Sequence, residues 1–192
     1  ENLVTDYLAR PTFTRQMVYY FRDLFRMGGT LGAVDLETVP AFAAQLASTN
    51  DSYMKLLTQS TNTCPTYNMA NNTFTAGNCA NGVTTHSGVL TNPGFLAQFN
   101  SNFNFRVARA VQETFNCAKH PAEFRDVPET REGKQYTSAF SWDALGSLSN
   151  GGRFDFHDTE GVVCANCHGS LNHVTPLWAN FNPMGLLRGH VV

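Results

Sequence analysis

Residues 13–29 read FTRQMVYYFRDLFRMGG, and this stretch indicates the fold class. Its large apolar side chains recur every three or four residues, a spacing that places them on one face of an α-helix. Gly28-Gly29 is expected to end that helix. The sequence therefore predicts an amphipathic helix over 13–27, with an apolar face formed by Phe13, Met17, Tyr20, Phe21, Leu24 and Phe25.

The opposite face of this helix carries Arg15, Arg22 and Arg26. A solvated charged stripe is the ordinary interpretation of such a face. The alternative is that one arginine docks on an anionic group, which its planar guanidinium recognises well.

Further helices are expected along the chain. Residues 36–48 form a second helical stretch, with Asp35 or Thr38 as the cap and Pro40 in the first turn. A short helix starts at Asp51, and the helical pattern returns from residue 93, most clearly over 103–115. No strong alternating pattern predicts strands. The fold class is therefore mainly α, with long irregular loops.

Composition excludes several classes of function. The chain has 192 residues, of which 42% are hydrophobic and 15% charged, against about 25% charged in typical domains. Thirteen Lys and Arg against fifteen Asp and Glu give a net charge of -2, so no basic field favours nucleic acid or anionic lipid. No apolar run predicts a transmembrane segment.

Glu1 is not an initiator Met, so we expect either a cleaved leader or a longer parent chain.

Cys164-Ala165-Asn166-Cys167-His168 is the motif that carries chemistry. C-x-x-C-H is the attachment signal for a c-type haem. The two thiols add to the haem vinyl groups, and the adjacent His168 becomes the proximal iron ligand. The sequence thus predicts one covalent haem c.

Two other chemistries use a C-x-x-C pair. A redox dithiol usually follows a strand in a βαβ unit, and no such pattern precedes Cys164. A structural zinc site needs a second ligand pair, and Cys64 and Cys79 are far apart in the sequence, although distant ligands can converge.

The remaining cysteines support an oxidising compartment. Covalent haem attachment takes place outside the cytoplasm, where disulfides persist, so we expect a periplasmic or extracellular protein. Residues 60–85 form a long loop that is rich in turn formers. Cys64 and Cys79 border that loop and are the preferred disulfide, which leaves Cys117 as a small buried apolar residue. A pairing that uses Cys117 is the alternative.

The C-terminal region offers candidates for the rest of a haem site. Met184 and His157 are the two main candidates for the sixth iron ligand, and His86, His120, His173 and His190 rank below them. For Met184 the alternative is a methionine that fills a packing gap near the haem. Trp178 is expected in the apolar wall around the porphyrin. Arg153 and Arg188 are candidates to pair with the haem propionates, although a solvated position is the ordinary one for each. We expect a helical region over 1–125 and a haem-binding region over 126–192, packed as one unit.

Several segments, in order, carry a resemblance to a known family. They are Pro11-Thr12-Phe13 leading into Tyr20-Phe21-Arg22-Asp23-Leu24, residues 51–58, residues 87–97, Arg106-Val107-Ala108-Arg109 with Cys117, and the haem motif with His157 before it and Pro176, Phe181, Gly185 and Arg188 after it.

In this order the segments resemble the C-terminal portion of large bacterial cytochromes that belong to domain-of-unknown-function families, abundant in planctomycetes and myxobacteria. The chain departs from them at Asn182, where the family has Asp, and at Leu171-Asn172-His173, where it has Ile-Asp-Pro. The Cys64–Cys79 loop is an insertion. The resemblance implies a single-haem cytochrome outside the cytoplasm and implies no substrate.

Three functions follow from these observations. The leading one is single-electron transfer between redox partner proteins, such as other cytochromes or subunits of a membrane complex. A haem peroxidase or oxidase is the alternative, which would need an open sixth position and an acid or base such as His157. A structural subunit of a larger redox assembly is the third, since obligate interfaces are poor in charge.

Overall fold

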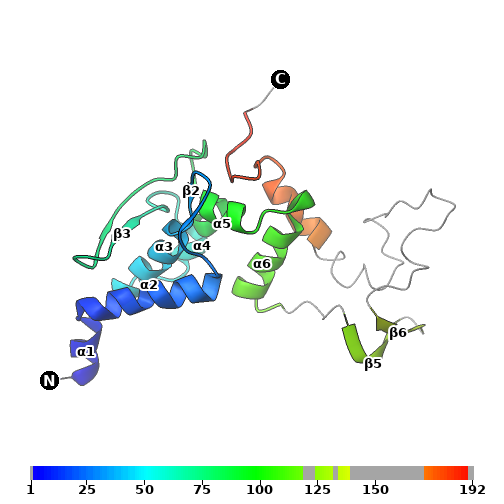
Figure 1. Cartoon of the computed structure of the whole chain (residues 1–192), viewed down its shortest axis with the longest axis horizontal. Coiled ribbons are helices and arrows are strands. Elements are labelled where there is room, and N and C mark those ends of the chain that lie inside the picture. The colour runs from blue at the N-terminus through cyan, green and yellow to red at the C-terminus, as the bar shows by residue number, and fades with distance from the viewer. Residues whose placement is uncertain (1, 119–123, 132–133, 139–170, 190–192) are drawn as a thin grey trace. The chain divides into compact units, whose positions relative to one another are not determined.

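The computed structural model describes residues 2–118, 124–131, 134–138 and 171–189 (Figure 1). The chain divides into two compact units. Unit 1 comprises residues 1–101 and 180–192, and unit 2 comprises residues 102–179. The bounds of these units differ from the expected regions 1–125 and 126–192, because the end of the chain returns to the N-terminal unit.

Unit 1 contains most of the helices that the structure describes. They are α1 (Leu3–Leu8), α2 (Pro11–Phe25), α3 (Thr38–Ser48), α4 (Lys55–Thr58), the 3₁₀ helix η1 (Gly88–Thr91) and α5 (Pro93–Gln98).

The predicted helix over 13–27 is α2, and its bounds have a physical cause. It begins at Pro11, whose fixed φ suits the first helical position. It ends at Phe25, because Arg26 adopts the left-handed conformation (φ 54°) and its N–H donates to the carbonyls of Arg22 and Asp23. The helix therefore ends at Phe25, three positions before the Gly28-Gly29 pair that was expected to end it.

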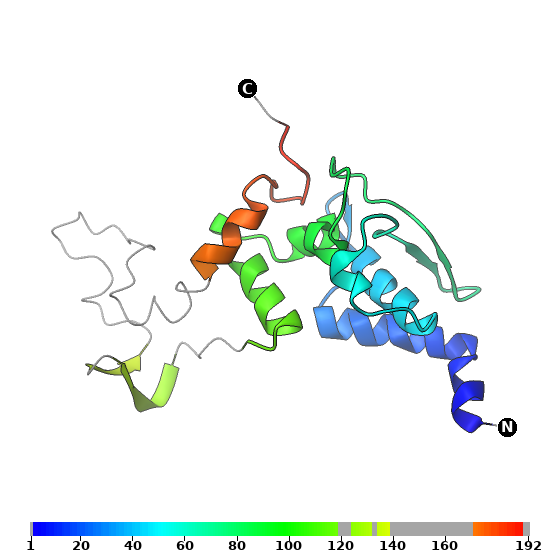
Figure 2. The same ribbon diagram turned by 180° about the vertical axis from the view of Figure 1, so that it is seen from behind.

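The core of unit 1 is built around α3. Val39 and Phe42 are fully buried, as are the alanines beside them, so this helix is apolar on nearly all sides. Such a helix is stable only when other elements surround it. α2 packs against it with Val18, Phe21 and Phe25 buried (Figures 1 and 2).

One arginine of α2 docks on an anionic side chain. Arg22 Nε lies 2.6 Å from Glu37 Oε2, and Glu37 Oε1 accepts a hydrogen bond of 2.8 Å from the Gly29 N–H. The alternative interpretation of the arginine face therefore holds at Arg22. The pair joins the end of α2 to the start of α3.

The structure contains strands that the sequence pattern did not predict. They form antiparallel hairpins: β1 (Thr30–Leu31) with β2 (Val34–Asp35), β3 (Thr66–Asn68) with β4 (Thr73–Thr75), and β5 (Phe124–Arg131) with β6 (Lys134–Ser138). Most of these strands have two or three residues, which is too short for an alternating pattern to be recognised. The β3–β4 hairpin lies inside the loop over 60–85 and pairs Tyr67 with Phe74.

Unit 2 contains η2 (Asn102–Asn104), α6 (Phe105–Phe115), β5, β6 and η5 (Thr175–Trp178). α6 matches the helix expected over 103–115 and buries Val107, Ala108 and Ala110. Residues 171–174 are helical and lead into η5, where Trp178 is buried. The described part of the chain is thus mainly α, as predicted. None of its helices combines the length and the apolar character needed to cross a membrane.

Candidate functional site

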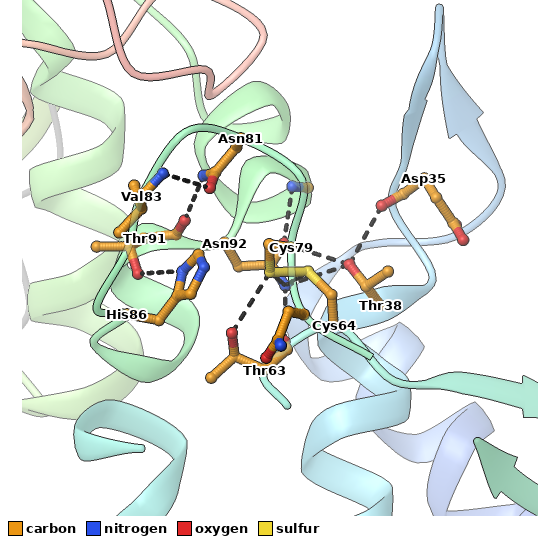
Figure 3. Close-up of a disulfide and its surroundings, with 12 residues drawn as sticks. Asp35, Thr38, Thr63, Cys64, Cys79, Asn81, Val83, His86, Thr91 and Asn92 are labelled. Atoms are coloured by element: carbon orange, nitrogen blue, oxygen red, sulfur yellow. Dashed lines mark hydrogen bonds between the residues drawn. A yellow bond between two sulfur atoms is a disulfide. The ribbon is translucent and has the colours of Figure 1, made fainter. Parts of the chain in front are cut away.

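The disulfide of unit 1 is surrounded by a polar network centred on Asn92 (Figure 3). Cys64 and Cys79 are bonded, which confirms the predicted pairing. The Asn92 amide nitrogen lies 3.1 Å from the Thr63 carbonyl oxygen, 3.2 Å from Thr38 Oγ1 and 3.1 Å from Cys64 Sγ. Because an amide has two hydrogens, the oxygens are its main acceptors and the sulfur is a close contact.

The other end of the Asn92 side chain caps α5. Its Oδ1 accepts hydrogen bonds from the N–H groups of Gly94 (2.8 Å) and Phe95 (3.4 Å). Pro93 occupies the first helical position, where its missing N–H costs nothing. Asn92 is fully buried, so a single side chain joins α3, the disulfide-closed loop and α5.

His86 is a second buried polar side chain in this region. Its Nδ1 lies 3.1 Å from Thr91 Oγ1, and its backbone N–H donates to the Ser60 carbonyl at 3.2 Å. Burial lowers the pKa of His86 from its ordinary value, and a hydrogen bond to the backbone of Cys79 opposes this only in part. The neutral imidazole is therefore the form that the fold accommodates.

The end of the chain is held on unit 1 by specific hydrogen bonds. We call residues 180–188 the strap. Asn81 Nδ2 donates to the carbonyls of Thr91 (2.8 Å) and Gly185 (3.0 Å), and the Leu187 N–H donates to the Asn81 carbonyl at 2.9 Å. Asn81 is buried, so these contacts are sheltered from water. Asn81 thus holds the strap at two points.

Gly185 allows the strap to lie close to α5. It has φ +69°, and a Cβ at this position would lie 2.6 Å from Pro93 Cα and 2.8 Å from the Pro93 carbonyl oxygen. A side chain cannot fit there without moving backbone. The glycine is therefore required both by its conformation and by the close approach.

The predicted haem residues fall in two groups. Cys164, Cys167, His168, Arg153 and His157 lie outside the described residues. The other three, Trp178, Arg188 and Met184, are placed by the structure.

Trp178 and Arg188 have contrasting environments. Trp178 is 3% exposed within unit 2, and its carbonyl accepts a hydrogen bond of 3.1 Å from Asn104 Nδ2. Arg188 is exposed, and its backbone N–H donates to the Asn180 carbonyl at 2.7 Å.

Met184 is partly buried against unit 1. It lies against the apolar cluster of Val34, Leu36 and Ala97, which joins β2 to α5. A Cβ placed on Gly32 would lie 3.3 Å from the Met184 Cε methyl group, so the side chain also reaches the turn between β1 and β2. Met184 therefore connects the strap to both elements.

The prediction of a metal-binding protein is wrong for the part of the chain that the structure describes. No group of three or more His, Cys, Asp or Glu side chains gathers there in a way that could hold a metal ion. Cys64 and Cys79 are bonded to each other, so neither offers a thiolate to zinc. The converging zinc ligands considered from the sequence are thereby excluded at these two positions.

Cys117 also differs from its prediction. It follows α6 with φ 52°, and its side chain is exposed rather than buried. The reason is its place beyond the end of the helix, where the apolar spacing of α6 no longer holds. Among the described cysteines it is the one outside the disulfide.

Comparison with known proteins finds no matching family model, no similar curated protein and no similar solved structure. The resemblance to the bacterial cytochromes stays a prediction.

Sequence reasoning did not identify Asn81 and Asn92 as organising residues. One local signal for Asn92 was present, since Asn followed by Pro predicts an N-cap with Pro at the first helical position. Nothing local distinguishes Asn81 from the other asparagines of its loop, because its partners include Gly185 from the end of the chain.

Proposed function

We propose that this protein is a c-type cytochrome that transfers single electrons outside the cytoplasm. The observation that carries the proposal is the Cys164-Ala165-Asn166-Cys167-His168 motif. In it, Cys164 and Cys167 would hold the porphyrin through thioether bonds, and His168 would be the proximal ligand of the iron. A bound haem c supplies one-electron cycling between ferric and ferrous iron.

The chemistry of the cysteines fits this proposal. The disulfide removes Cys64 and Cys79 from other reactions, and Cys117 is an exposed thiol that follows α6. Cys164 and Cys167 are then the one pair in the sequence with the spacing for two thioether bonds. A disulfide in the same chain also supports an oxidising compartment.

The rest of the chain would support electron transfer by surrounding the haem with apolar side chains. Trp178, which follows the motif in the sequence, is a large buried aromatic side chain, and an apolar shell tunes a redox potential by excluding water. We propose redox proteins as partners, including other cytochromes or subunits of a membrane-bound complex. Periplasmic or extracellular localisation is part of the same proposal.

The test is expression of the chain in a host that matures c-type cytochromes. We expect a pyridine haemochrome spectrum typical of two thioether bonds, and an intact mass that includes one haem. The Cys164→Ser/Cys167→Ser variant should lose the covalent haem, and the matched Cys117→Ser variant should keep it. A wild-type protein that carries bare thiols, a bridged sulfur pair or zinc at the motif would refute the proposal.

Carbon monoxide and cyanide distinguish electron transfer from the enzymatic alternative. A six-coordinate iron resists these ligands, whereas an open sixth position binds them rapidly. We expect a slow spectral change in the resting protein. A rapid change would favour a peroxidase or oxidase.

A further inference from the structure

The strap forms a turn that is held by hydrogen bonds within its own residues. Asn182 Oδ1 accepts hydrogen bonds from the N–H groups of Met184 (2.9 Å) and Leu186 (3.0 Å). The backbone of Asn182 bonds to Leu186 and Gly185 at 2.9 Å, and Phe181 forms a β-bridge with Leu187. The position of Met184 is therefore defined by the turn itself.

This turn directs Met184 into unit 1. The backbone of the turn bonds to Asn81 at the Gly185 carbonyl and at the Leu187 N–H. Gly185 also lies against Pro93. The Met184 side chain packs on the cluster formed by Val34, Leu36 and Ala97, and its methyl group reaches Gly32. A flexible thioether side chain is well suited to fill such an irregular gap between a hairpin and a helix.

We infer that Met184 is the anchor that holds the strap against the β1–β2 turn and α5, and that it is not the sixth ligand of the haem. The second half of this inference rests on the proposed function. An axial methionine must direct its sulfur lone pair at iron with the porphyrin face against it. Met184 is instead partly buried against the apolar cluster of unit 1, and its methyl group lies near Gly32.

The test compares two substitutions that separate volume from sulfur. Met184→Leu keeps an apolar side chain of similar size and removes the thioether, and Met184→Ala removes both. We expect Met184→Ala to lower Tm by about 4 °C and Met184→Leu by less than about 2 °C. The matched control is Met54→Ala, since Met54 is 66% exposed and its loss should leave Tm unchanged.

The spectroscopic readout decides the ligand. With haem attached, Met184→Leu should keep the ferric spectrum and the midpoint potential of the wild type. A lost methionine–iron charge-transfer band or a lowered potential in Met184→Leu would show that Met184 is a ligand and would overturn the inference. A Met184→Ala variant with the Tm of the wild type would overturn the anchor role.

Failure of the proposed function gives a different result. If wild type and variants all lack covalent haem by mass, the cytochrome proposal fails and the ligand statement fails with it. The Tm values still decide whether Met184 anchors the strap. If Met184→Ala does not fold, the Met184→Leu protein and its spectrum still test the ligand statement, and the loss of folding supports the anchor.

Discussion

The two ends of the described chain show different ways of ordering a segment. α1 is a regular helix with an N-cap, in which the Val4 N–H donates to Asn2 Oδ1 at 3.1 Å, yet it buries none of its residues. The strap has almost no regular secondary structure, yet it buries Phe181 and Gly185 and bonds to the buried Asn81. Regular backbone hydrogen bonding and attachment to the fold are therefore separate properties.

The physical reason lies in what each segment exchanges with water. α1 has six residues, and isolated helices of that length are marginal because their exposed hydrogen bonds merely replace bonds to water. The strap buries Phe181 and part of Met184, and its backbone at Gly185 and Leu187 bonds to the buried Asn81. Breaking one of those pairs leaves a buried group unsatisfied, which is costly.

The largest effect is expected at the close approach of the strap to α5. Gly185→Ala places a Cβ 2.6 Å from Pro93 Cα at φ +69°, so both a clash and backbone strain oppose the fold. We expect the free energy of unfolding to fall by about 3 kcal/mol. Chemical denaturation measures this loss.

Two glycine controls separate the causes. Gly29→Ala has nearly the same φ (+70°) with nothing within 4 Å, so it reports strain alone and should cost about 1 kcal/mol. Gly189→Ala has neither a positive φ nor a close neighbour and should be neutral. A Gly185→Ala loss no larger than that of Gly29→Ala would show that the strap does not pack closely on Pro93.

A smaller effect is expected from a pair of helix caps. Asn92→Ala removes a buried cap and leaves groups around the disulfide unsatisfied, so we expect a loss of about 2 kcal/mol in the free energy of unfolding. Asn2→Ala removes an exposed cap from α1 and should cost about 0.5 kcal/mol. Equal losses in denaturant titrations of the two variants would contradict the contrast between buried and exposed regions.

The smallest effect concerns the protonation of His86. Because burial lowers its pKa in the folded protein, the unfolded chain takes up a proton first as the pH falls through the ordinary value of 6.5. Stability should therefore decrease below that pH and stop decreasing below the folded pKa. Thermal midpoints measured between about pH 7.5 and 5 should show this slope.

His86→Gln is the variant that isolates this contribution. It removes the titrating ring and leaves the other histidines, so their share of the pH dependence is common to both proteins. The difference between wild type and variant should shrink as the pH falls. An identical slope in both proteins would mean that His86 is not the buried neutral group described above.

The helices were predictable from local sequence, and the short strands were not. α2 and α6 each repeat apolar residues over three or four turns, which is long enough for the period to be recognised. α3 is apolar on nearly all sides and was predicted instead from its local signals, among them Pro40 in the first turn. β1 and β2 have two residues each, and the turn between them contains Gly32 with φ 59°. Such a hairpin depends on its neighbours more than on its own sequence.

The candidate site also has a part that was predictable from the sequence and a part that was not. The disulfide was predictable because Cys64 and Cys79 border one loop. The role of Asn81 was not, since its partner Gly185 is 104 residues away. Met184 was predicted as a candidate iron ligand from the sequence alone, which takes no account of the apolar cluster on which it packs.

The order of amino acids by itself determined the mainly helical class, the disulfide and the presence of a C-x-x-C-H motif, because each depends on residue types at short separations. The tertiary structure decided that Asn81 and Asn92 became buried side chains that join several elements. It also decided that the strap lies on unit 1. Those outcomes depend on contacts between distant residues, whose burial sets the cost of an unpaired amide or a misplaced Cβ. No local pattern contains that information.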